Sequence, residues 1–79
     1  MHVPGCNHAY LDEPTGRGDA RAQGNTLYCQ LRYESLNCDQ AMSSYIAFNG
    51  PRWKDVRVIV RRGEQMLCDQ TYAGDGTPK

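Results

Sequence analysis

VRVIVRRGEQMLCDQTY, residues 56–72, decides the fold class that we expect for this chain. Up to Arg61, valines alternate with arginines and one isoleucine, which is the two-residue period of a half-buried β-strand. Gly63 interrupts this pattern, and a second strand-like run with Cys68 inside it follows. The stretch therefore predicts an antiparallel β-hairpin with one apolar and one polar face.

The length of the hairpin loop determines which face each side chain occupies, because a slip of one residue turns every side chain over. Two three-residue loops, Arg61-Arg62-Gly63 and Arg62-Gly63-Glu64, both place Cys68 on the valine face together with Met66. A two-residue loop would place Asp69 there, so we expect three residues. The outer face is then left with Arg57, Ile59 and Arg61.

Three further segments complete a predicted set of four strands. TLYCQLRYE, residues 26–34, alternates strictly, with Leu27, Cys29, Leu31 and Tyr33 on one side. Residues 42–48 also alternate and are predicted as a strand, although a helix remains the alternative because Ala and Met favour helices. Short connections favour antiparallel neighbours. We expect an all-β fold, a small antiparallel sheet curled into a barrel or half-sandwich, with strands near 26–34, 42–48, 54–61 and 66–72.

The 79 residues suffice for one domain. Residues 1–25 are rich in Gly, Pro, Asn and Asp, and predict a loop segment packed on or pinned to the domain, in which only HAYLDE favours a brief strand or helical turn. Residues 26–73 form the predicted β-domain. The glycine-rich residues 74–79 predict a flexible tail.

Four cysteines, an even number, suggest that disulfides staple this small core. Sequence alone leaves all three pairings of Cys6, Cys29, Cys38 and Cys68 open. Disulfides predict an oxidising compartment, so we expect a mature secreted, periplasmic or envelope protein, with a cytoplasmic protein carrying free thiols as the alternative. PGC at 4–6 resembles the end of a bacterial lipoprotein signal, which would make Cys6 a lipid anchor, but the preceding apolar stretch is missing.

The chain lacks the residue spacings of a metal site or a catalytic centre. The cysteines are separated by 22, 8 and 29 residues, without the close pairs of a structural zinc site. Both histidines lie within the first eight residues, so no cysteine or serine has an obvious base nearby. We therefore expect no metal, no cofactor and no enzymatic activity. Arg17-Gly18-Asp19 matches an integrin-binding tripeptide, which is too short to carry weight.

Nine basic and nine acidic residues give no net charge, which argues against nucleic acid as a partner. Basic residues nevertheless concentrate at 52–62, together with a tryptophan, and arginine with aromatic residues is typical of protein-binding hot spots. The plainer interpretation is that these charges protect an edge strand from aggregation. The longest apolar runs have three residues, too few for a membrane span. The partner-binding candidates are Trp53, Arg57, Arg61, Arg62 and Tyr72.

The sequence thus favours a small non-enzymatic module that docks on a protein partner, as inhibitor, immunity or exclusion proteins do. The alternative is a cytosolic small β-barrel that binds nucleic acid or an anionic ligand through the basic hairpin 52–62.

Overall fold

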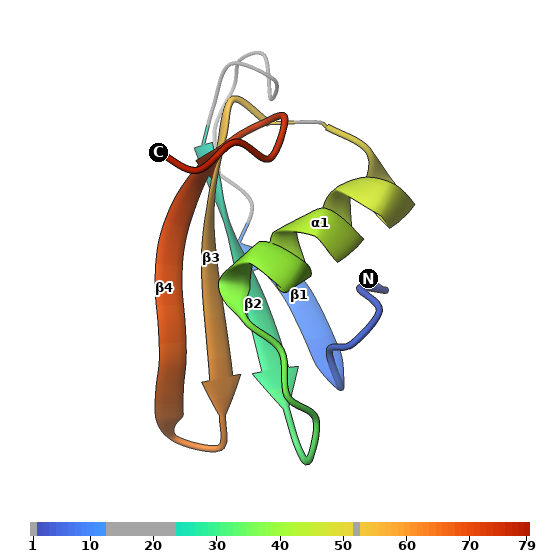
Figure 1. Ribbon diagram of the computed structural model, residues 1–79, viewed down its shortest axis with the longest axis vertical. Coiled ribbons are helices and arrows are strands. Elements are labelled where there is room, and N and C mark those ends of the chain that lie inside the picture. Colours follow the sequence, from blue (N-terminus) through green and yellow to red (C-terminus); the bar gives the residue numbers. More distant parts are fainter. Residues whose placement is uncertain (1, 13–23, 52) are drawn as a thin grey trace.

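A computed structural model describes residues 2–12, 24–51 and 53–79. It contains one sheet with the strand order β1-β2-β3-β4 and one helix, α1 (Figure 1). The small, predominantly β class is confirmed, but the sheet is mixed and open, where we expected an antiparallel barrel or half-sandwich. The elements are β1 (His8–Asp12), β2 (Gly24–Leu31), α1 (Cys38–Asn49), β3 (Asp55–Arg62) and β4 (Gln65–Ala73).

The two central strands, β2 and β3, run parallel, while β1 and β4 pair antiparallel at the two edges. A parallel pair needs a long connection, because the chain must return to the end of the sheet where the first strand began. Residues 32–54 make this return, and α1 within them lies across one face of the sheet (Figure 1). The expectation of short connections between antiparallel neighbours is therefore wrong at this crossing.

α1 replaces the strand that alternation predicts over residues 42–48. Its N-cap is Asn37, whose side chain accepts the backbone N–H of Gln40 at 2.8 Å, while the Gln40 side chain accepts the Asn37 N–H at 3.0 Å. Gly50, with a φ of +75°, ends the helix, and Pro51 cannot continue it. Burial follows helical spacing, on Cys38, Ala41, Met42 and Tyr45.

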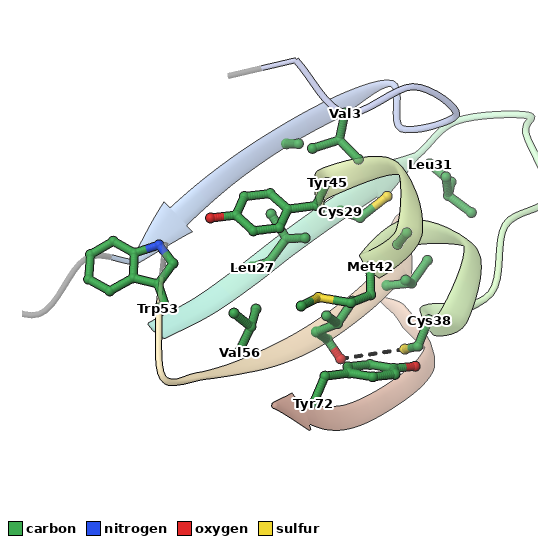
Figure 2. Packing of buried hydrophobic residues seen from close by; sticks show 14 residues of the cluster. Val3, Leu27, Cys29, Leu31, Cys38, Met42, Tyr45, Trp53, Val56 and Tyr72 are labelled. Atoms are coloured by element: carbon green, nitrogen blue, oxygen red, sulfur yellow. Dashed lines mark hydrogen bonds between the residues drawn. The ribbon is translucent and has the colours of Figure 1, made fainter. Parts of the chain in front are cut away.

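The core lies between α1 and the sheet (Figure 2). The alternation in β2 and β3 is confirmed, because the alternate apolar residues of both strands face the helix and are almost fully buried. Tyr33 does not follow the pattern: β2 ends at Leu31, and Tyr33 is 85% exposed. The buried cluster comprises Val3, Ala9, Leu27, Cys29, Leu31, Cys38, Ala41, Met42, Tyr45, Trp53, Val56, Val58, Val60 and Tyr72.

The hairpin between β3 and β4 differs from the expected register. Arg62 pairs with Gln65, so the loop has two residues, and an irregularity then shifts the register between Val60 and Arg61. This β-bulge supplies the extra residue that we assigned to the loop, and it brings Cys68 opposite Val60 on the core face. Met66, expected on that face, pairs with Arg61 instead and is 57% exposed.

All four cysteines are paired in two disulfides. Cys6–Cys29 ties the N-terminal segment to β2, and Cys38–Cys68 ties the start of α1 to β4. With its sulfur bonded to Cys29, Cys6 has no thiol to carry a lipid. The Cys38 sulfur also lies 3.4 Å from the carbonyl oxygen of Val58, a packing contact because a disulfide sulfur carries no hydrogen.

The two terminal segments pack against the sheet and the helix. The expected N-terminal loop 1–25 contains β1, and its residues 13–23 lie outside the described ranges. Residues 74–79, expected as a flexible tail, fold back along β4: Ala73 N–H donates to the Thr77 carbonyl at 2.8 Å, and Lys79 N–H donates to Thr71 at 3.1 Å. The Lys79 ammonium also pairs with the Asp55 carboxylate.

Gly74 is required where this tail passes the start of β3. A Cβ there would lie 1.8 Å from the carbonyl oxygen of Trp53, and the Gly74 N–H donates to the Lys54 carbonyl at 2.7 Å. We expect Gly74→Ala to lower the free energy of unfolding by about 3 kcal/mol, because two backbone segments must separate. Gly63→Asn, at a turn glycine with open space around it, is the control and should cost under about 1 kcal/mol. Equal costs in guanidinium denaturation would contradict this close approach.

The disulfides make a second prediction. Under non-reducing conditions the chain should resist alkylation and be about 4 Da lighter than its reduced form, because each bond removes two hydrogens. Replacing Cys38 and Cys68 together by alanine should lower the free energy of unfolding by about 3 kcal/mol, measured by denaturation. Alkylation of all four cysteines without reductant would show that the bonds do not form.

Candidate functional site

We call the face of the sheet opposite α1 the open face, because no helix or strand of the described ranges packs over it. Strand register arranges its side chains in three rows across the four strands. The rows differ in chemistry, with a mainly apolar row between two polar ones. The first row is Asp12, Thr26, Arg57 and Thr71; the middle row is Tyr10, Tyr28, Ile59 and Asp69; the third row is His8, Gln30, Arg61 and Met66.

The middle row contains two tyrosines and an isoleucine. Tyr10 and Tyr28, paired across β1 and β2, stack with ring centroids 4.8 Å apart and planes at 17°. His8 packs obliquely on Tyr10, with centroids 5.8 Å apart. Ile59 beside Tyr28 is only 8% exposed, although it lies on the uncovered side. The neighbouring side chains therefore already form a cohesive patch.

The two arginines of the open face differ in their electrostatic state. Arg57 donates from Nε and Nη2 to the two carboxylate oxygens of Asp69, at 2.9 and 2.5 Å. These hydrogen bonds lower the pKa of Asp69, so the pair stays charged but mutually neutralised. Arg61 makes no ion pair with any described residue, and its buried Nε has no hydrogen-bond partner there. Arg61 is thus the cation of this face that remains available.

The other sequence-predicted candidates lie elsewhere. Arg62 is exposed at the hairpin end, where its Nη2 donates to the carbonyl of Glu34 at 2.6 Å. Trp53 and Tyr72 belong to the buried core cluster, with exposed fractions of 6% and 1% (Figure 2). Partner binding by the five candidates stays a prediction; of the five, Arg57 and Arg61 lie on the open face, whereas the rings of Trp53 and Tyr72 are buried.

Sequence reasoning missed the tyrosine stack. The outward position of Tyr28 could be predicted, because it alternates with Leu27 and Cys29 and must face the other way. The position of Tyr10 could not be predicted, since nothing in HAYLDE indicates that this short segment pairs with β2. The position of Met66 on the open face was mispredicted, because the bulge shifts its register. The pairing of the strands, which unites these side chains, is a long-range property.

A shallow pocket of about 270 Å³ lies between the start of α1 and β4. Its polar groups are already engaged: Asn37 caps the helix, Asp39 accepts the Tyr72 hydroxyl at 2.5 Å, and Asp69 holds Arg57. Its two sulfurs form the Cys38–Cys68 bond. These lining side chains do not provide a free nucleophile together with a general base.

The described residues contain neither a candidate metal cluster nor a membrane-spanning helix. Among residues 2–12, 24–51 and 53–79, no group of three or more His, Cys, Asp or Glu side chains is placed to hold a metal ion. No helix in that part of the chain has the length and hydropathy to cross a bilayer. The tripeptide Arg17-Gly18-Asp19 lies outside the described residues.

Compared with protein-family models, curated proteins and solved structures, the chain shows no significant match to any of them.

Tyr72 makes alkaline stability testable. Burial, and then the hydrogen bond to Asp39, raise the pKa of Tyr72 far above its usual 10.0. An acid whose folded-state pKa is raised stabilises the fold while it is protonated, so this contribution is complete below about pH 10 and fades as the pH rises above it. In an absorbance titration, Tyr72→Phe should remove an ionisation that the parent chain shows only well above pH 10. Tyr72→Phe should weaken the fall of stability above pH 10; an unchanged fall would contradict the assignment.

Proposed function

We propose that this chain is a non-enzymatic protein-binding module of the secreted or envelope space, and that its open face is the docking surface. The observation that carries the proposal is the one-sided sheet. α1 covers one face, while the other presents stacked tyrosines, an unpaired arginine and an exposed methionine. Tyrosine, arginine and methionine are enriched at protein interfaces relative to other surface.

The physical state of this face supports docking. The rings are held by their stack and by the sheet, so little side-chain entropy is lost on binding. The two disulfides tie both the N-terminal segment and the helix to the sheet, and they are consistent with an oxidising compartment. The action expected is steric occlusion of a partner's surface, as in an inhibitor or immunity protein.

Nucleic acid fits this face less well. Bases bind best to aromatic rings whose faces are free, whereas Tyr10 and Tyr28 stack on each other. One arginine of the face is neutralised, and the cytosolic alternative assumes free thiols that the structure pairs.

Photo-crosslinking tests the proposal directly. A benzophenone amino acid is placed at Met66, which is exposed in the third row, and in a second chain at Ser43, which is exposed on α1 away from the sheet. Each chain is added to envelope and secreted extracts, irradiated and analysed by mass spectrometry. We expect a protein adduct from Met66 that excess unlabelled chain suppresses, and none from Ser43.

The outcomes separate the candidate functions. A specific protein adduct from Met66 supports docking, and Arg61→Ala should reduce its yield about threefold or more, since an interfacial charge is lost. A nuclease-sensitive adduct would instead indicate nucleic acid. Equal yields from both positions, or no adduct at Met66, would refute the open face as the docking surface.

A further inference from the structure

We propose that a second copy of this chain occupies the open face, so that two sheets pack face to face as a two-fold symmetric sandwich. This inference rests on the proposed function, because it names a partner for the same surface. Sheets with uncovered inner faces pack about 10 Å apart with strands aligned within about 30°. Two-fold dimers are by far the commonest homo-oligomers, and their interface must be self-complementary.

The two-fold axis of such a dimer can lie in two directions, and the register of the sheet specifies which side chains face each other in each case. An axis parallel to the strands lays β1 on the partner's β4 and β2 on its β3, and keeps each row facing the same row. An axis across the strands lays each strand on itself and exchanges the first row with the third.

Charge excludes the axis across the strands. It would set Arg57 against Arg61 of the second copy, and Asp69 against its own counterpart. Like charges brought face to face and removed from water are strongly unfavourable.

The axis parallel to the strands avoids every like-charge contact among the three rows. In the middle row Tyr28 faces Ile59, and by symmetry Ile59 faces Tyr28. The Tyr10 hydroxyl faces Asp69 and can donate to it, and in the third row Arg61 faces Gln30, an amide acceptor. Tyr28 and Ile59 lie on the two central strands, nearest the axis, where the angle between the sheets displaces them least. The open face is therefore complementary to itself in one orientation only.

The area available determines the strength that we expect. The strands have five, eight, eight and nine residues. At about 3.3 Å per residue and about 4.8 Å between neighbouring strands, they cover roughly 500 Å² per copy, or about 1,000 Å² in total. Stable interfaces bury about 1,200–2,000 Å². The dimer should therefore be weak and depend on concentration, so measurements must extend from about 1 μM to 1 mM.

Sedimentation equilibrium of the intact oxidised chain is the first measurement. We expect a shift from the 8.9 kDa monomer towards twice that mass with rising concentration. Tyr10→Asp places a carboxylate opposite Asp69 of the second copy and should raise the dissociation constant at least about tenfold. Ser43→Asp adds the same charge on the exposed side of α1 and should leave the constant unchanged. Tyr10 is 43% exposed, and circular dichroism confirms that its variant is folded.

Isotope-filtered nuclear Overhauser spectra then test the orientation. In a mixture of chains labelled only at isoleucine and chains labelled only at tyrosine, contacts between Ile59 methyls and the Tyr28 ring of the other chain support the proposed axis. Contacts of Tyr28 with Tyr28, or of Ile59 with Ile59, overturn it.

Two other outcomes overturn the dimer itself: a folded chain that stays monomeric to about 1 mM, or equal effects of Tyr10→Asp and Ser43→Asp. A monomer that still gives a specific protein adduct from Met66 would leave the proposed function standing with a different protein as partner. Loss of both would remove the proposed function as well.

Discussion

The parallel pairing of β2 with β3 is the constraint from which the rest of the structure follows. It requires a crossover connection between the two strands, and α1 forms that connection across one face of the sheet. With antiparallel edge strands on both sides, the crossing supplies the only helix in the described part of the chain, so only one face receives a helical cover. The valine face is thereby buried, and the tyrosine face is left open.

The two disulfides cross-link this arrangement on the side of the sheet that the helix covers. In a 79-residue chain with a small core, two segments gain a covalent link to the sheet: the N-terminal segment and the first turn of α1. Cys6–Cys29 fixes the first of these to a central strand, and Cys38–Cys68 fixes the second to an edge strand. Both bonds lie on the helix-covered side of the sheet, through Cys29 and Cys68. The disulfides therefore restrain the sheet from its helix-covered side, and no cysteine lies in the three rows of the open face.

Local patterns predicted the central strands well, because alternation in 26–31 and 56–60 reports directly which side of the sheet is buried. The helix was mispredicted although its signal was present: Asn37-x-x-Gln40 is a capping box and Gly50-Pro51 a stop, but the alternation of 42–48 outweighed them. The bulge before Cys68 could not be predicted, since it depends on the pairing of that residue with Val60 on another strand. The candidate site shows the same limit: Arg57 is neutralised by Asp69, a neighbour on the other strand, and local sequence does not specify that neighbour.

Using one face for both self-association and docking has a thermodynamic consequence. The same tyrosines and Arg61 cannot contact a second copy and another protein at once, so the two equilibria compete. A weak dimer costs the docking reaction little at low concentration, because nearly all chains are then monomers with free faces. At high local concentration the dimer covers the aromatic surface and keeps it from non-specific contacts. Self-complementarity and zero net charge on the open face are therefore compatible with a docking role, provided that the other protein buries more area than the roughly 1,000 Å² that the dimer supplies.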